Sequence, residues 1–459
     1  MSVTTPHPPR PNPGTARPQG PGGPGAPGGP GQQAPAPPRP VGRVRRRTAN
    51  VSIGSLPVSN VVTIEVGLAI ALLVLTLMGV KEPSGALNVV SVSIAGGVLF
   101  IALVLAFTRR RGRWLTQWIG VRLRYNFRSH TRTAKRMDPS ESKPGDDELP
   151  VLGPEDPRVA LLRLAIPDLV IAKGVDHERR PLALSWHDGV WTAVLLVDPT
   201  PPLISAIGTA PSLPLGALAP CLEDRGVVLD AITVIWHCYP GSAALPPNSP
   251  AISSYMEVLG PLPAAARRTT WITVRLDPRR CGEAIRERGG GVVGAHRALI
   301  GALSRVRNAL ESAGVTIRPL DSDELLRAAI SSAELTAAVG NTNPVSLREK
   351  WSGVTAGGVG HASYAITGWP SKGLKGSLNS LTGVRALSST LAMSISPSRE
   401  DGQVSLRGLV RVSARTPSEL DRADDQLSKL SDKLDITLTP LKGMQLAGLA
   451  ATLPLGGVA

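Results

Sequence analysis

Two long apolar stretches dominate the pattern of the first quarter of the chain. Residues 61–80 (VVTIEVGLAIALLVLTLMGV) and residues 88–107 (NVVSVSIAGGVLFIALVLAF) are almost free of charge. A helix of about 20 residues, rising about 1.5 Å per residue, crosses the hydrocarbon core of a bilayer. The pattern therefore predicts two transmembrane helices within residues 51–108, joined by the short link KEPSGAL.

A buried helical hairpin of a soluble protein is the alternative, and it is disfavoured because soluble core helices rarely run this long without charge. Glu65 is the only acidic residue in the first stretch. Two roles are open for its carboxylate. It reaches back to the cytoplasmic interface beside the arginines, or it makes a polar contact inside the membrane or with another subunit.

The segment that follows the second apolar stretch, residues 109–136, is basic and periodic. Trp114, Trp118 and Tyr125 recur at helical spacing. Four arginines come directly after the apolar stretch: Arg109, Arg110, Arg111 and Arg113. We predict a basic amphipathic, membrane-proximal helix, which either lies among the lipid headgroups or packs its aromatic stripe on a partner or on the rest of the chain.

Residues 137–157 are acidic and rich in proline, which predicts a linker. In residues 158–459 the pattern alternates between the period of strands and the period of helices. The expected strands are 182–186, 190–197, 227–236, 271–276, 362–367, 390–396 and 404–414, and the longest expected helices are 292–312, 321–338 and 417–433. These elements predict an α/β (α+β) domain with mixed sheets.

A short repeated sequence pattern indicates that this domain consists of two similar halves. The segment Val315-Thr316-Ile317, followed by Pro319-Leu320 and a helix, recurs 121 positions later as Ile436-Thr437-Leu438, followed by Pro440-Leu441 and a helix. A repeated unit gives such a pattern. Because the match is short, chance agreement is the alternative.

Charge is distributed unevenly along the 459 residues, whose formal net charge is +15. Residues 1–47 hold seven arginines and no acid, and residues 109–136 hold ten lysines and arginines and no acid. The remainder after residue 136 is close to neutral, so it lacks the broad basic face that nucleic acid requires. Residues 1–40 contain 14 prolines and 8 glycines, from which we expect residues 1–50 to be a disordered cytoplasmic tail.

Arginines flank the two apolar stretches on their outer sides, whereas the link between them carries one lysine and one glutamate. By the positive-inside rule, both termini face the cytoplasm. The protein is thus expected to be a multi-pass membrane protein whose large C-terminal part is cytoplasmic. Three cysteines in so long a chain, Cys221, Cys238 and Cys281, fit a reducing compartment.

Motifs that carry chemistry are weak in this sequence. Residues 289–294 (GGGVVG) satisfy GxGxxG, but the segment before them is charged and helix-like, where the dinucleotide fingerprint needs a strand. No GxxxxGK[ST] and no GxSxG occurs in the sequence, and the cysteines and histidines lack the spacing of a zinc site. His361, His187 and Asp188 are better explained by hydrogen bonding and turns than by acid–base chemistry. We therefore predict no catalytic residue, no cofactor and no metal.

The order of these segments resembles EccE, a membrane subunit of the ESX (type VII) secretion system of mycobacteria and other actinobacteria. The closest likeness lies in residues 111–125 (RGRWLTQWIGVRLRY) and 361–370 (HASYAITGWP). The resemblance implies a non-catalytic scaffold subunit that supports the assembly or stability of the inner-membrane core. The partners it implies are EccB, the ATPase EccC, EccD and the mycosin protease, besides membrane lipids. The alternative is a membrane-anchored α/β enzyme acting on a nucleotide-sugar or a lipid-linked substrate.

Overall fold

The computed structural model describes residues 45–46, 52–53, 56–79, 89–110, 113–134, 156–198, 213–239, 267–340, 344–370, 378, 380–384, 386–398 and 403–457. Most of the proline-rich tail and all but the end of the linker at 137–157 lie outside these residues. What the sequence predicts for them stays a prediction.

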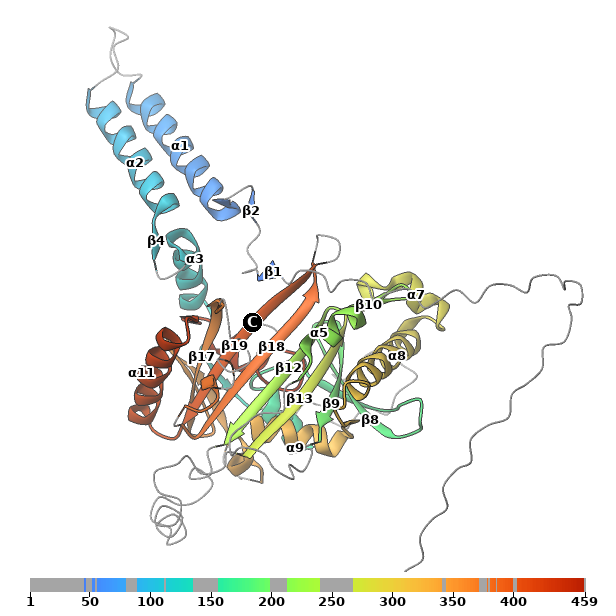
Figure 1. Cartoon of the computed structure of the whole chain (residues 1–459). Coiled ribbons are helices and arrows are strands. Elements are labelled where there is room, and N and C mark those ends of the chain that lie inside the picture. The colour runs from blue at the N-terminus through green and yellow to red at the C-terminus, as the bar shows by residue number, and fades with distance from the viewer. Residues whose placement is uncertain are drawn as a thin grey trace, which may run out of the picture. The chain divides into compact units, whose positions relative to one another are not determined.

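The N-terminal part contains two apolar helices, α1 (Val58–Gly79) and α2 (Val89–Phe107), which Figure 1 shows next to each other. Both are long and apolar enough to cross a membrane, with mean hydropathies of 2.2 over Asn60–Leu77 and 2.6 over Val89–Phe107. Gly67 lies where they meet, since a Cβ added there would sit 2.3 Å from the Ala102 Cβ. The expectation of two apolar helices is confirmed, within three residues at each end.

Most of the strands among the described residues belong to one 14-stranded sheet. Figure 1 shows its central strands β17, β19, β18, β12, β13 and β9 side by side. Its strands are β1 (Arg45–Arg46), β6 (Thr131–Thr133), β7 (Val170–Val175), β8 (Pro181–His187), β9 (Val190–Val197), β12 (Ala231–Tyr239), β13 (Arg267–Leu276), β14 (Ile317–Pro319), β15 (Ser346–Glu349), β16 (Val354–Ala356), β17 (Val359–Gly368), β18 (Ser388–Pro397), β19 (Val404–Ala414) and β20 (Thr437–Pro440). Three separate two-strand ladders pair β2 (Ser52–Ile53) with β3 (Leu56–Pro57), β4 (Arg109–Arg110) with β5 (Arg113–Trp114), and β10 (Glu223–Asp224) with β11 (Val227–Val228).

The expected mixed sheets are wrong for this domain. Every pairing in the large sheet is antiparallel except that of β1 with β19. Tight turns such as Asp188-Gly189 and Gly357-Gly358, all with positive φ, join neighbouring strands into hairpins, and hairpins are necessarily antiparallel. The helical crossovers likewise return the chain to an antiparallel position, because β14 pairs with β9 and β20 with β17.

The order of the strands reads similarly from either end. One side runs β7-β8-β9-β13-β12 and the other β15-β16-β17-β19-β18, and β12 pairs with β18 at the seam. The pair Ile235–Ala392 lies in the middle of this seam. Following the ladders from Arg318 and Thr439, two residues that are also 121 positions apart, leads to Ile235 on one side and Ala392 on the other.

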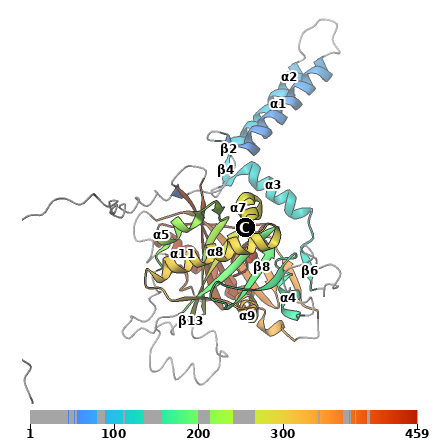
Figure 2. The ribbon, with the colours of Figure 1, turned by 90° about the vertical axis from the view of Figure 1, so that its right-hand side faces the viewer.

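Helices cover both faces of the sheet, and Figure 2 shows α8 in front of it. On one face pack α8 (Gly291–Glu311), α11 (Pro417–Lys433) and the short α5 (Leu215–Leu218) and α7 (Gly282–Glu287). On the other face pack α4 (Pro157–Leu162), α9 (Ser322–Ser332) and α12 (Gln445–Ala451). The apolar stripe predicted for α8 is buried, with Leu299, Leu303 and Val306 at 3% exposure or less. Its bounds and those of α11 follow the prediction closely.

The helix predicted over residues 109–136 is shorter than expected. It is α3, Leu115–Asn126, preceded by the β4–β5 ladder and followed by β6, which joins the edge of the large sheet. Two features of the local sequence explain this. Gly112 is a poor helix former, and the β-branched residues Thr131 and Thr133 favour a strand.

Candidate functional site: the docked membrane-proximal segment

One side chain, Asn60 in the first turn of α1, connects the last turn of α2 to the first turn of α3. Its Nδ2 donates a hydrogen bond to the Ala106 carbonyl in α2 at 2.6 Å. Its Oδ1 accepts one from the Thr116 hydroxyl in α3 at 2.5 Å. Asn60 is fully buried, so both bonds are shielded from water. This amide therefore sets where α3 starts relative to the helical hairpin.

One face of α3 packs on Trp351, which lies in the turn between β15 and β16. Trp118 and Tyr125 meet the Trp351 ring edge-on, at centroid distances of 5.9 and 5.2 Å. The Arg122 guanidinium carbon lies 4.6 Å from the same centroid, a cation–π geometry. The aromatic stripe that the sequence predicts thus contacts this chain's own domain.

Gly443, in the loop before α12, allows these segments to approach. A Cβ added at Gly443 would lie 2.4 Å from the Trp351 ring and 3.0 Å from a methyl group of Val121. Its φ of +72° is also a backbone conformation that favours glycine. Its N–H donates to the Trp351 carbonyl at 2.8 Å. Glycine is therefore required here both by space and by conformation.

An ion pair closes the far end of α3. Arg128, just after the helix, pairs with the carboxylate of Glu349, whose side chain is only 1% exposed. The same guanidinium donates to the Gly443 carbonyl at 3.0 Å. The other carboxylate oxygen accepts from the Leu446 N–H at the start of α12, at 3.1 Å. A buried carboxylate needs such partners, because burying an unpaired charge is costly.

Backbone pairing then continues into β6. The Glu349 N–H donates to the His130 carbonyl at 2.7 Å, and Thr131–Thr133 pair with Ser346–Arg348 of β15. Arg132 also donates to the Leu164 carbonyl at 3.2 Å. Burial, together with the neighbouring Arg128, lowers the pKa of Arg132. The segment from α3 to β6, with Trp351, Glu349 and Gly443 beneath it, is named the dock below.

The residues predicted from the sequence as membrane or partner contacts are only partly brought together. Trp118 and Tyr125 lie in the dock, Trp114 is half-buried directly before α3, and Glu65 is exposed on α1. The predicted arginines lie in or beside the β4–β5 ladder: Arg109, Arg110 and Arg113 belong to its strands, and Arg111 falls outside the described residues. Contact with a membrane or a partner stays a prediction for all eight residues.

Sequence reasoning missed Asn60, Trp351, Glu349 and Gly443. Three of these are separated from α3 by more than 200 residues, and no local pattern pairs them with it. Asn60 carried a usable signal, since a polar residue directly before an apolar stretch of this length needs a hydrogen-bond partner.

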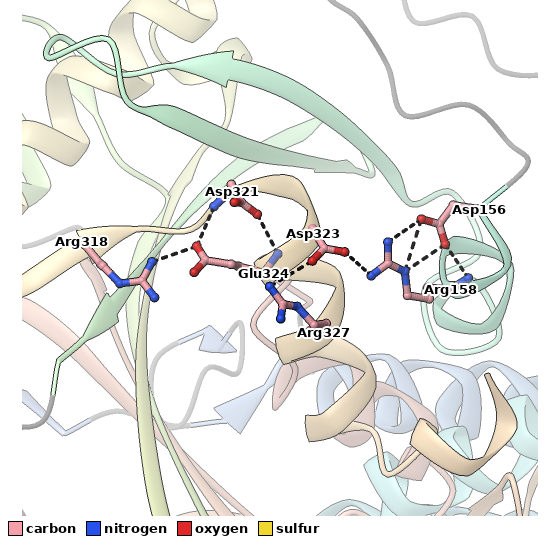
Figure 3. A network of polar contacts seen from close by, with 7 residues as sticks. All are labelled: Asp156, Arg158, Arg318, Asp321, Asp323, Glu324 and Arg327. Atoms are coloured by element: carbon pink, nitrogen blue, oxygen red, sulfur yellow. Dashed lines mark hydrogen bonds and ion pairs between the residues drawn. The ribbon is translucent and has the colours of Figure 1, made fainter. Parts of the chain in front are cut away.

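A second polar network joins the first helix of the domain to α9, as Figure 3 shows. Arg158 binds Asp156 at 2.8 Å and Asp323 at 2.6 Å. The hydrogen bond from Arg158 lowers the pKa of Asp156. Within α9, Asp321 and Glu324 form a capping box, and Arg318 binds Glu324 at 2.8 Å. These contacts cap helices and join them, which is a structural role.

A row of buried polar side chains crosses the neighbouring strands β12, β18, β19 and β17, and Arg411 in this row donates to the Ser332 carbonyl at the end of α9. His237 Nδ1 lies 2.8 Å from the Thr390 hydroxyl, to which Arg411 donates at 3.0 Å. His361 Nδ1 lies 2.9 Å from the Ser413 hydroxyl. Burial lowers the pKa of His237 to about 3 and that of His361 well below its ordinary value. Both rings are thus neutral, at most 1% exposed and hydrogen-bonded, as expected for His361.

The other residues weighed for chemistry lie apart from this row. His187 and Asp188 are at the β8–β9 turn, where Asp188 has a φ of +51°. The GGGVVG segment follows α7 and not a strand, and a Cβ at Gly294 would lie 2.3 Å from the Ile285 carbonyl oxygen. That glycine therefore serves helix packing. Among the described residues, no group of three or more His, Cys, Asp or Glu has metal-binding geometry.

Comparison with known proteins gives consistent matches. Residues 264–366 match the family model of EccE, the type VII ESX secretion system translocon. The chain is 29% identical over 194 residues to ESX-1 secretion system protein EccE1 of Mycobacterium tuberculosis (strain H37Rv), covering 41% of this chain and 39% of that protein. It is 33% identical over 120 residues to the protein of the same name from Mycolicibacterium smegmatis, covering 26% and 23%.

The matched part thus spans about two fifths or less of these relatives. Of the two segments on which the resemblance was based, 361–370 overlaps the family match and 111–125 lies outside it. The resemblance predicted from the sequence is confirmed.

Proposed function

We propose that this chain, which is similar to the EccE family, is a non-catalytic structural subunit of an ESX inner-membrane complex, which holds other subunits in place for protein export. The dock is the observation that carries the proposal. Asn60 joins both apolar helices to α3, and Trp351 with Glu349 joins α3 to the sheet. Such a link between the apolar hairpin and a large domain suits a part that positions its neighbours.

The proposal includes that α1 and α2 span the membrane with both termini in the cytoplasm. The length and apolarity of both helices support it, as do the arginines on their outer sides. A cysteine in place of Ser84 should react with an impermeant reagent added from outside the membrane, while a cysteine in place of Ser140 should not. Reaction at position 140 alone would show that the topology is the opposite of the one proposed.

The proposed partners are EccB, the ATPase EccC, EccD and the mycosin protease. Replacing both Trp114 and Trp118 by alanine should weaken assembly of the complex while insertion into the membrane stays intact. Trp351→Ala should have the same effect, because it removes the ring on which Trp118 packs. Trp351→Phe keeps a ring there and should restore assembly. Normal assembly of both alanine variants would leave α3 without a role in the complex.

We also propose that the two halves of the domain are a repeated unit. The strand order from either end supports this, as does the central pair Ile235–Ala392, which the ladders reach from Arg318 and Thr439, 121 positions apart within the repeated segment. In the second half the outer strand, β15, pairs with β6 of the dock. In the first half no strand among the described residues pairs with the outer side of β7. The two ends of a repeated unit would then serve different neighbours.

A further inference from the structure

The face of α3 turned away from Trp351 carries exposed apolar side chains. Leu123 is 51% exposed and Phe127, which closes the last turn, is 87% exposed. At about 100° per residue, both point to the side of the helix opposite Trp118 and Tyr125. Docking on the domain therefore leaves this ridge, Leu123 with Phe127, uncovered within the described residues.

The direction of the ridge is given by Thr116. Thr116 lies on the same side of α3 as Leu123 and Phe127, and its hydroxyl binds Asn60 in the first turn of α1. Asn60 in turn binds Ala106 in the last turn of α2. The side of α3 with the ridge is thus the side that meets the ends of the hairpin, where a membrane surface would lie if α1 and α2 span the bilayer.

The charge of α3 suits an anionic surface. Its sequence, LTQWIGVRLRYN, contains two arginines and no acid, and Arg128 follows it. Arg124 is exposed beside the ridge, whereas Arg122 is held over the Trp351 ring. Apolar side chains in the headgroup region with arginines beside them are typical of helices that lie in the membrane interface.

We propose that Leu123 and Phe127 insert into the boundary between headgroups and acyl chains, and that Arg124 binds the phosphates of anionic lipids. α3 is then held between the bilayer on one side and Trp351 on the other. This inference rests on the proposed function, because it requires that the hairpin span the membrane. The ligand of α3 is then the lipid surface, and the residues that touch the lipid are Leu123, Phe127 and Arg124 and not the tryptophans.

The test uses the full-length protein in liposomes of phosphatidylcholine and phosphatidylglycerol. A fluorophore is attached to a cysteine that replaces Phe127, and quenching by lipids with a nitroxide close to the headgroup is measured. Cys221, Cys238 and Cys281 are buried and do not compete for the label. Asn126→Cys, one residue away and turned by about 100° around the helix, is the matched control.

Emission from position 127 should fall by about half or more, as for a group at interfacial depth, and that from position 126 clearly less. Arg124→Gln should reduce quenching at 127 in the mixed liposomes and leave it unchanged in phosphatidylcholine alone. Equal quenching at 126 and 127 would overturn the proposal. So would shielding at 127 that is seen only when other subunits of the complex are bound, because a protein would then cover the ridge.

A label at position 73 separates this inference from the proposed function. Leu73 lies in the middle of α1 and is 55% exposed. If lipids with a deep nitroxide quench a label there but position 127 is not quenched, the hairpin spans the bilayer and only the ridge proposal fails. If position 73 is not quenched either, the spanning hairpin fails as well.

Discussion

Replacing Arg128 by methionine removes the cation that faces the buried carboxylate of Glu349. The guanidinium also donates to the Gly443 carbonyl. The change therefore removes one contact to Glu349 of β15 and one to the loop before α12. Methionine retains the length and apolar character of the stem, which limits the loss to charge and hydrogen bonds. After the change, among the described contacts, the Glu349 carboxylate retains the hydrogen bond from the Leu446 N–H.

The size of the effect follows from burial. Breaking a buried ion pair by removing one partner costs about 3–5 kcal/mol. Glu349 is 1% exposed, but the Arg128 side chain is 34% exposed, so water can partly replace the arginine. We therefore expect the loss of Arg128 to lower the free energy of opening of the dock by about 2–3 kcal/mol. This corresponds to about a 30- to 150-fold rise in the equilibrium constant for opening.

Hydrogen exchange of the full-length protein in detergent measures this opening directly. Amide protection in peptides that cover β6 and β15 should fall by about that factor, while peptides from β12 and β13 keep theirs. Arg124→Met is the matched control, because the Arg124 side chain is exposed and, among the described contacts, binds neither Glu349 nor Gly443, so its replacement should change protection little. In a Glu349→Gln background, Arg128→Met should cost much less, since no buried charge is left unpaired.

Protection in β6 and β15 that changes by less than about threefold would refute the reasoning. The ion pair would then contribute no more than an exposed one, and the dock would have to be held by its aromatic contacts alone. An equal loss in the Arg124→Met control would show instead that exchange responds to the charge of α3 in general.

Three other outcomes are expected. Gly443→Ala should open the dock by about 1–2 kcal/mol from backbone strain alone, and by more as the Trp351 ring is displaced, measured by the same exchange experiment. Burial keeps the pKa of His237 near 3, that of His296 near 4 and that of His361 well below its ordinary value, so the unfolded chain takes up protons first as the pH falls below about 6.5. Each should cost about 1.4 kcal/mol of stability per pH unit below that point, and a denaturant midpoint that stays constant from pH 7 to 5 would contradict this. A His361→Asn variant that assembles at normal abundance should support export like the wild type; if it assembles but does not export, the histidine takes part in chemistry.

Most individual elements could be predicted from the sequence because their signals are local. The apolar lengths of α1 and α2, the apolar stripe of α8 and the Asp188-Gly189 turn each depend on neighbouring residues. The similar segments that end at Pro319 and Pro440 form β14 and β20, where these prolines pair with Leu195 of β9 and Tyr364 of β17.

What could not be predicted depends on pairings across long distances in the sequence. Nothing in the sequence around Trp351 indicates that Trp118 packs on it, and the periodicity of α3 indicates an apolar face without naming what covers it. The prediction of mixed sheets was wrong for a related reason. A helix between two strands is compatible with parallel neighbours and with an antiparallel return, and the outcome is decided by which strand edge is free when the chain arrives.

The position of the dock at one end of the sheet has a mechanical consequence. From β6 to β7 the strands form a path of eleven, and ten steps of about 4.8 Å each give at most about 48 Å between its ends. The dock joins α3 to the β6 end of this path and β7 forms the opposite end, while β1, which precedes the hairpin, pairs with β19 nearer the middle. A force applied at β7 would therefore act on the dock over a distance of up to this length. The resulting torque would load the Trp351 contact, the Arg128–Glu349 pair and the β6–β15 ladder.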